Sequence, residues 1–513
     1  MESLYLAMRK FFLFLAISAT GAGAAHAQKI PDPRPFAKTI TAEDLKKHLY
    51  IVASADFEGR ETATEGQHKA AAYIENHFRS LGLLPGNGDN YQLPYPVYQD
   101  SLVSAGLTVG DNHFTLNTDF YAPAANNTIG ITGSEIIFAG YGITDSTRDD
   151  YKGLNVRGRI VVVLAGNPPG TPAPTGRRQR GPARQDIAQR NGAAAVLILM
   201  SSGSPIPPQG ASPKGNMSIT EYKRTNSPDY LYITDKVAQA IFGGDFPQLQ
   251  SGAPMSKIYN ANIRLDITKT TNHLQASDVL GFLPGTDLKD QIVVISAHMD
   301  HLGKRNGEIY YGADDDGSGT VSILEIASAF AKARAAGKGP RRSILFLANS
   351  GEEEGLWGSQ FYTDHPTYPL DKTDVDLNID MIGRIDPNRK IGDSMNYVYV
   401  VGSDKLSTDL KPISEGNNKK YSKLELDYKF DDPTDPERIY YRSDHFNFAR
   451  KGVPIIFYFD GIHADYHRPT DTPDKINYDL MEKRAQFVFY TAWDMADRNE
   501  MLKRDIALPA MSR

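Results

Sequence analysis

Five short runs dominated by apolar residues constrain the fold of this chain more than any other feature. They are IVVISA (292–297), SILFLA (343–348), VDLNI (375–379), YVYVV (397–401) and VPIIFYF (453–459). Segments with helical patterns separate them, including an amphipathic segment that starts near Gly319 and stops at Gly337. Apolar strands that alternate with helices form mostly parallel sheets covered on both faces. We therefore predict an α/β fold with a mostly parallel central sheet between helices.

Three more helices are expected outside this region of strands. Residues 41–54 carry an N-cap signal at Thr41. Residues 64–82 place apolar side chains from Ala71 to Leu81 on one face and stop at Gly82. Residues 479–498 close the pattern with a last helix.

The stretch from 101 to 267 differs in character, because short β-rich runs alternate there with turns. Two apolar strands stand out, GRIVVVLAG and AAAVLILM, with a Pro-, Gly- and Arg-rich loop from Asn167 to Arg184 between them. The charges of that loop (Arg177, Arg178 and Arg180) are interpreted as solvated. We predict an inserted domain at 101–267 and a discontinuous main domain at 38–100 and 268–505.

The first residues predict export. Arg9 and Lys10 precede a short apolar run, and Ala25-His26-Ala27 follows, which is the order of a signal peptide cleaved after residue 27. The run is shorter than the roughly 20 residues that cross a bilayer, so we expect a secreted or periplasmic protein without stable membrane insertion; an uncleaved anchor is the alternative. A net charge of −6 argues against a nucleic-acid partner.

Polar residues follow the apolar runs at the predicted carboxyl edge of the sheet, where open α/β sheets bind ligands. This set is His298, Asp300, His301, Asp314, Asp315, Asp316, Glu352, Glu353, Glu354, Asp380, His463, Asp465, Tyr466 and His467. A single acidic residue at the start of a helix is explained by its favourable interaction with the helix dipole. That explanation does not readily account for several segments that all bring histidines and acids to one edge of the sheet.

The composition of this set indicates a metal site. The chain has no cysteine, so histidine and carboxylate ligands remain, which suit Zn²⁺ and, less well, Mn²⁺ or Co²⁺. Their number exceeds what one catalytic zinc takes from a protein, and a pair of ions sharing one carboxylate fits better.

Five motifs in order carry a family resemblance. SAHMDHLG, GADDDGSG, SGEEEGLWGS, LNIDMIG and YHRPTDT together resemble the co-catalytic di-zinc exopeptidases, which include secreted bacterial aminopeptidases and glutamate carboxypeptidase II. DFEGRETATEG is similar to the first segment of that family, and residues 136–164 look like the protease-associated domain inserted in some members. The resemblance extends from about residue 40 to the last helix.

The resemblance implies a ligand set for two Zn²⁺ ions per chain, with Mn²⁺ or Co²⁺ as substitutes. It assigns His298 and Asp380 to one ion, Glu353 and His467 to the other, and Asp315 to both as the bridge. The 38–100 and 268–505 segments would then form the zinc exopeptidase domain.

The resemblance also implies catalytic roles. Glu352 would be the general base that activates a water shared by the ions. Asp300 would accept the free ring N–H of His298. Tyr466 is the candidate donor to the tetrahedral oxyanion, with Tyr441 as a rival.

Neighbouring residues receive ordinary explanations. Asp314 and Asp316 are expected as turn and N-cap residues, and Glu354 as an acid in the first turn of a helix. His301 and His463 are expected to lie behind the ligands or on the surface, since the ligand set is already complete.

The sequence therefore predicts a secreted zinc metallopeptidase that removes N-terminal residues from peptides. A carboxypeptidase or dipeptidase of the same fold is an alternative; it needs a cation for the substrate carboxylate, and Arg384, Arg438 and Arg442 are candidates. A glutaminyl-cyclase-like enzyme and a non-catalytic binding protein are weaker alternatives, because no ligand is missing. Side-chain preference and oligomeric state stay open.

Overall fold

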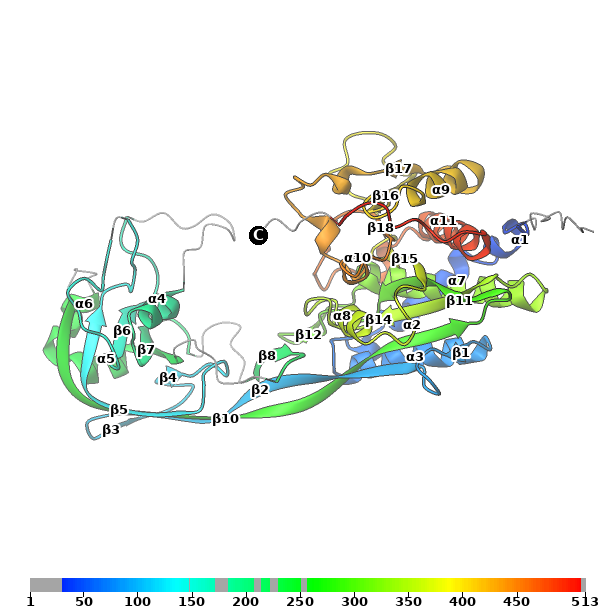
Figure 1. The fold of residues 1–513 in the computed structure, drawn as a ribbon. Helices are drawn as coiled ribbons and strands as arrows, with labels where there is room; N and C mark the ends of the chain where they lie inside the picture. The colour runs from blue at the N-terminus through cyan, green and yellow to red at the C-terminus, as the bar shows by residue number, and fades with distance from the viewer. Residues whose placement is uncertain are drawn as a thin grey trace, which may run out of the picture.

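The computed structural model describes residues 30–146, 148–170, 183–206, 214–221, 229–250 and 256–508. The predicted leader, 1–27, and the three loop arginines, Arg177, Arg178 and Arg180, lie outside these ranges. The described chain forms two lobes joined by a long two-stranded ribbon (Figure 1). Among the described helices, none is both long and apolar enough to cross a membrane.

The larger lobe contains the sheet that the apolar runs predicted, in the strand order β17-β16-β18-β15-β11-β14-β10. Its strands are β10 (Ser256–Leu283), β11 (Leu288–His298), β14 (Arg342–Asn349), β15 (Thr373–Ile379), β16 (Tyr397–Val401), β17 (Glu425–Asp427) and β18 (Ile455–Phe459). The four central strands β18, β15, β11 and β14 are parallel, and β16 and β10 flank them antiparallel. The mostly parallel α/β fold is confirmed.

Each face of this sheet has its own apolar core. Along β11, Val293 and Ile295 enter one core while Ile292 and Val294 enter the other, as the alternation of side chains along a strand requires. Helices cover both faces. The first core is covered by α1 (Arg34–Ala37), α2 (Ala42–Val52), α3 (Glu65–Ser80), α7 (Gly319–Ala335), α9 (Leu410–Asn417) and α11 (Tyr478–Asp497), and the second by α8 (Trp357–Asp364) and α10 (His445–Ala449).

Two of the predicted helices have the predicted ends. The Thr41 side chain accepts a hydrogen bond from the backbone N–H of Asp44 and caps α2, and α3 stops just before Gly82, which has a φ of 70°. The prediction that α7 is amphipathic is wrong. Its residues from Gly319 to Phe330 are all buried, because the helix lies between the sheet and helices α1, α2 and α11.

The ribbon consists of β2 (Gln92–Val109) and the antiparallel β10, paired from Gln92↔Val279 to Val109↔Ile263 with an irregularity at Thr268/Lys269. β2 starts in the larger lobe and continues into the second lobe, and β10 runs in the opposite direction, from its pairing with β5 in the second lobe to its pairing with β14 in the larger lobe. One hydrogen-bonded sheet therefore extends through both lobes. Short strands attach along it: β1 (Leu84–Pro85), β3 (Asn112–Phe114) and β8 (Lys214–Ser218).

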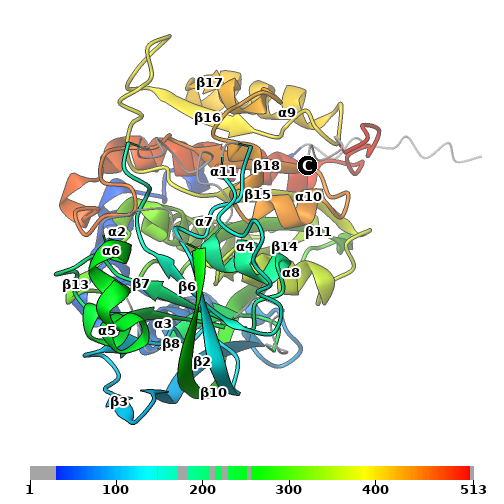
Figure 2. The ribbon, with the colours of Figure 1, turned by 90° about the vertical axis from the view of Figure 1, so that its left-hand side faces the viewer.

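The second lobe has its own core on each side of a small sheet. The sheet contains β4 (Phe120–Tyr121), β5 (Ile129–Ala139), β6 (Ile160–Leu164), β7 (Ala195–Leu199) and β9 (Asp229–Ile233), with helices α4 (Arg184–Arg190), α5 (Asp235–Phe242) and α6 (Phe246–Gln250). Val162 of β6 packs with α5, and Val161 packs with α4 on the opposite face. Figure 2 looks at the molecule from the side of this lobe, with α4 and α5 flanking the strands.

Candidate metal centre

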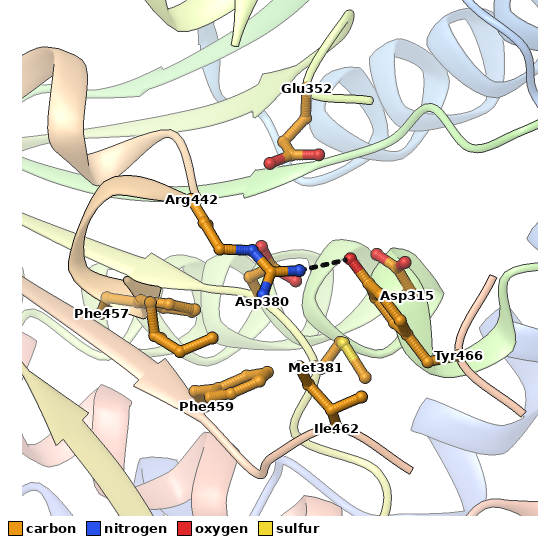
Figure 3. A pocket seen from close by; sticks show the side chains of 10 residues that line it. Asp315, Glu352, Asp380, Met381, Arg442, Phe457, Phe459, Ile462 and Tyr466 are labelled. Atoms are coloured by element: carbon orange, nitrogen blue, oxygen red, sulfur yellow. Dashed lines mark hydrogen bonds between the residues drawn. The ribbon is translucent and has the colours of Figure 1, made fainter. Parts of the chain in front are cut away.

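The predicted ligands come together at the carboxyl ends of the parallel strands. His298 is the last residue of β11, and Asp380 follows β15 directly. Glu353 lies in the loop after β14, Asp315 in the irregular turn before α7, and His467 in the loop after β18. The structure thus places all five around one centre; Figure 3 shows Asp315 and Asp380 beside the pocket that opens there.

The five residues form two halves that meet at Asp315. On one side, His298 Nε2 lies 3.3 Å from Asp315 Oδ1 and 3.7 Å from Asp380 Oδ1. On the other side, His467 Nε2 lies 3.0 Å from Asp315 Oδ2 and 3.1 Å from Glu353 Oε2. Asp315 therefore offers one carboxylate oxygen to each half, which is the arrangement that a bridging ligand needs.

Several donor atoms in these halves are buried without a hydrogen-bond partner among the described residues. They include His298 Nε2, Asp315 Oδ2 and Glu353 Oε1, whose close polar neighbours belong to the same cluster but do not have hydrogen-bond geometry toward them. Burying an unpartnered polar atom costs about 1–3 kcal/mol, and more when the group is charged. A divalent cation would satisfy these atoms, and imidazole and carboxylate donors without sulfur fit zinc. The residues present therefore fit the predicted metals.

Asp316 is less suited to ligate than its neighbour, although its carboxylate also lies near His298 and Asp380. Its oxygens already accept hydrogen bonds from the backbone N–H groups of His298, Gly319 and Met381. Gly319 is the first residue of α7, and Ser318, and not Asp316, occupies the N-cap position of that helix. Asp316 accepts the first backbone N–H of the helix from two residues further upstream, and it also ties α7 to two strand ends.

Asp314 lies in the irregular turn, where the sequence expected a turn residue. It is fully buried, its Oδ1 accepts a hydrogen bond from Gly383 N, and its Oδ2 lies 3.2 Å from His463 Nε2. His463 and His301 are also buried, so the surface alternative is wrong for both histidines. His301 Nδ1 lies 2.7 Å from Glu353 Oε1, close enough to orient that carboxylate.

Glu354 also departs from the expectation of a first-turn helix acid, because α8 begins only at Trp357. It stands instead in the loop at the edge of the centre. Burial raises the pKa of Glu354 to about 7, and the charges of Asp300 and Glu61 add to this effect.

Two residues that the sequence did not single out hold the aspartate turn in place. Asp471 Oδ2 accepts hydrogen bonds from the backbone N–H groups of Asp314 and Asp315, at 3.0 and 3.2 Å. Arg60 is completely buried, and its guanidinium donates to the carbonyl oxygens of Val52, Met299, Tyr311 and Gly312. A lone arginine in DFEGRETATEG gives no sequence signal for such a role, since its acceptors are backbone atoms and three of the four lie far along the chain.

Gly312 is required at the start of this turn. It has a φ of 54°, and a Cβ atom there would lie 2.3 Å from Asp315 O and 2.4 Å from the His301 ring. A larger residue would push the turn away from His301, so the glycine before the three aspartates lets the turn pack against the centre.

Glu352 lies where a base could serve both halves. Its Oε2 is 3.9 Å from His298 Nε2, and its backbone N–H donates to Asp300 Oδ1 at 3.2 Å. Burial raises the pKa of the Glu352 carboxyl well above its ordinary value; His298 opposes this shift, and Asp380 and Glu353 increase it. A raised pKa favours a carboxylate that must accept and return a proton.

Asp300 supports this arrangement from behind. Thr62 Oγ1 donates to Asp300 Oδ2 at 2.8 Å. The nearest oxygen of Asp300 to His298 Nδ1 is the backbone carbonyl at 3.1 Å, and the carboxylate is at 3.6 Å. The ring N–H that the sequence assigned to the carboxylate therefore has its closer acceptor in the main chain.

The ribbon holds the loop that carries Glu352 and Glu353. Asp278 of β10 accepts a hydrogen bond from Ser350 N at 2.8 Å, and the Tyr95 hydroxyl of β2 donates to Ser350 O at 3.0 Å. The acidic loop is thus anchored to both strands that lead to the second lobe.

The pocket beside the centre has a polar side and an apolar side. Asp315, Glu352, Asp380, Arg442 and Tyr466 line the polar side, and the apolar side is lined by Met381, Ile439, Phe457, Phe459 and Ile462 (Figure 3). The rival tyrosine, Tyr441, is not among the lining residues; it packs against Phe446 instead.

The comparisons with known proteins agree with this geometry. Residues 278–492 match the model of peptidase family M28. The chain is 30% identical over 226 residues to a probable leucine aminopeptidase of Trichophyton verrucosum, covering 42% of this chain and 57% of that one. It is 29% identical over 143 residues to a vacuolar membrane protease of Candida tropicalis, covering 28% of this chain and 14% of that protein. The chain thus spans little more than half the length of the leucine aminopeptidase that it matches.

Two solved structures share the fold along nearly the whole chain. An aminopeptidase from Aneurinibacillus sp. strain AM-1 superposes with a TM-score of 0.54 at 19% identity, covering 94% of this chain and 100% of that one. A zinc aminopeptidase from Bacillus subtilis gives a TM-score of 0.53 at 19% identity, covering 91% and 99%. At this identity the likeness establishes the fold.

Proposed function

We propose that this protein is a secreted metallo-aminopeptidase that uses two zinc ions to remove N-terminal residues from peptides. One observation carries the proposal: Asp315 presents one oxygen to each of two histidine–carboxylate halves, with Glu352 beside them. His298 and Asp380 would hold one ion, Glu353 and His467 the other, and Mn²⁺ or Co²⁺ could substitute. The name of the curated fungal relative supports the aminopeptidase class.

The side chains would divide the work of peptide hydrolysis. Zinc bound by these residues would polarise the scissile carbonyl and make the attacking water more acidic. Glu352 would take the proton of that water and pass it to the leaving amine nitrogen as the C–N bond breaks. Tyr466 would donate its hydroxyl proton in a hydrogen bond to the oxyanion. Asp300 would hold the Glu352 backbone and the His298 ring in place.

A carboxypeptidase or dipeptidase is the second candidate, because one arginine lines the pocket. Arg384 is engaged by Asp465 at 3.0 Å, and Arg438 lies over the Tyr441 ring, whereas Arg442 faces the pocket. Arg442 could therefore receive a substrate carboxylate. The aminopeptidase is favoured because the Arg442 guanidinium is already hydrogen-bonded to Tyr466 at 3.2 Å.

Export and domain division are parts of the same proposal. The signal pattern of 1–27 supports secretion or export to the periplasm. Separate apolar cores support a catalytic domain at 38–100 and 268–505 and an inserted protease-associated domain at 101–267.

Blocked peptides test the reaction direction. We would compare Leu-Gly-Gly with its N-acetylated and its C-amidated forms and follow the products by mass spectrometry. An aminopeptidase cleaves the free and amidated peptides and leaves the acetylated one intact. Cleavage of the acetylated peptide, with loss on amidation, would establish a carboxypeptidase and contradict the proposal.

A further inference from the structure

The hydroxyl of Tyr466 is not isolated at the pocket. It accepts a hydrogen bond from Arg442 Nη2 at 3.2 Å (Figure 3), and both residues line the pocket beside Glu352 and Asp380. Arginine has donors only and stays charged at working pH. The bond therefore uses a lone pair of the phenol and leaves the phenolic proton free.

Nothing else in the described chain takes that proton. Among the residues that the structure describes, Tyr466 has no hydrogen-bond acceptor for its O–H group. Its ring is stacked on the ring of His467, with 3.9 Å between centroids and 22° between planes. The ring of Tyr466 is thus held against His467, a proposed zinc ligand. Its hydroxyl proton can therefore point into the pocket.

Arg442 is also held in position. The next residue, Ser443, accepts a hydrogen bond from Asn378 of β15 at 2.9 Å, and Asp444 accepts one from Ser359 of α8. The other end of the guanidinium is 3.7 Å from the exposed Glu437, an ion pair that solvent screens. Its positive charge is therefore available to the phenol.

We propose that Arg442 is a positioning residue that acts through Tyr466. It occupies a lone pair of the hydroxyl, turns the phenolic proton toward the pocket and polarises the O–H bond, so that Tyr466 becomes a stronger donor to the developing oxyanion. The inference rests on the proposed peptidase function. It assigns a role to an arginine that would otherwise be taken for a binder of substrate carboxylate.

A double-mutant cycle tests this role on the zinc-loaded, full-length enzyme. We would measure kcat and KM for leucine p-nitroanilide, which has no carboxylate, in the wild type, Arg442→Met, Tyr466→Phe and the double variant. Tyr466→Phe should lower kcat about 100-fold, the loss typical of one oxyanion donor. Arg442→Met should lower kcat about 10-fold with KM nearly unchanged, because it weakens that same donor. In the Tyr466→Phe background it should have almost no further effect.

Controls separate positioning from folding. Arg442→Lys should restore part of the lost kcat, since a lysine can still donate to the phenol. Arg438→Met changes an exposed arginine four residues away that does not line the pocket, and it should leave both constants unchanged. Each variant is checked for bound zinc and melting temperature.

Two outcomes would overturn the inference. Equal effects of Arg442→Met with and without the Tyr466 hydroxyl would show that the arginine acts independently. The second outcome comes from the dipeptide Leu-Gly, which has a free carboxylate and is measured beside the anilide. If Arg442→Met raises KM for Leu-Gly and leaves both constants for the anilide unchanged, Arg442 is a carboxylate binder. If the wild type hydrolyses neither substrate, the proposed function itself fails, which is a distinguishable result.

Discussion

Three consecutive aspartates have three different environments in this protein. Asp315 has oxygens facing both histidine–carboxylate halves, Asp316 accepts three backbone N–H groups, and Asp314 pairs with Gly383 and His463. Like charges so close together would repel each other unless partners offset them. The partners differ for each residue, so conservative substitutions should have different consequences.

We predict that Asp315→Asn lowers bound zinc from two ions per chain to one or none, because both halves lose a charged ligand. Asp314→Asn should keep two zinc ions but destabilise the fold by about 1–3 kcal/mol, since one buried hydrogen bond is lost. Elemental analysis after dialysis and denaturant unfolding measure both effects. Equal zinc loss in the two variants would contradict the assignment of the bridge to Asp315.

The sequence predicted which residues come together at the proposed metal centre, but not the residues that support them. His298 is the last residue of β11 and Asp380 directly follows β15, so the edge of the sheet brings them together independently of the loop conformations. Arg60 and Asp471, in contrast, act on backbone atoms more than 150 residues away in the chain. A backbone N–H or carbonyl group can form a hydrogen bond whatever side chain its residue carries. The sequence around the bonded backbone group therefore gives no sign of the contact.

At the level of elements, the predicted strands and the capped helix α2 agree with the structure, and the errors have physical causes. The α7 pattern looked amphipathic because small residues such as Ser322 and Ser328 alternate with apolar ones. Both serines are buried, and their hydroxyls donate to carbonyl oxygens one turn earlier. Because these hydroxyls are satisfied within the helix, α7 can be buried on all sides although its sequence contains polar residues. The acids after β14 lie in a loop anchored by Tyr95 and Asp278, and not in a helix.

The contact between α3 and α7 should make stability depend on pH. Burial lowers the pKa of His77 to about 4, and the charge of the nearby His48 contributes to this shift. The folded pKa lies below the unfolded value of about 6.5, so the unfolded chain binds more protons between these values. Stability from this site is present above pH 6.5 and is lost as the pH falls toward 4, by up to about 3 kcal/mol.

His77→Gln tests this pH dependence. Glutamine can still donate toward Ser328 and the Leu324 carbonyl, which lie 3.1 and 3.3 Å from His77 Nε2, but it does not titrate. The free energy of unfolding of the variant should fall less steeply than that of the wild type from pH 6.5 to 4. Parallel curves for the two proteins would show that His77 does not titrate as proposed.

For the whole molecule, the length of the ribbon was the least predictable feature. The sequence suggested a domain boundary near 101 and 267, yet β2 and β10 run through both positions as unbroken strands. Side chains alternate along the ribbon in the same way on both sides of the boundary between the lobes. The change in composition therefore predicted where the second lobe begins, but not that one strand crosses the boundary. The separate cores nevertheless support two units.

We predict that the larger lobe folds alone. Leu102 pairs with Lys269 across the ribbon, so replacing residues 103–268 by Asn-Gly would close a short hairpin. Tyr95 and Asp278, which anchor the acidic loop, are retained. The shortened chain should bind two zinc ions and hydrolyse leucine p-nitroanilide, although it loses the packing of Met217 and Ile219 near Trp357. An unfolded product by circular dichroism would contradict the division.

The most direct test of a two-zinc peptidase is a zinc titration of chelated protein, with bound metal and anilide hydrolysis measured together. Binding should reach two ions per chain, activity should return with them, and Glu352→Gln should bind two ions while losing about 10²–10⁴ of kcat. Full activity in metal-free protein, or near-normal kcat in zinc-loaded Glu352→Gln, would contradict the account.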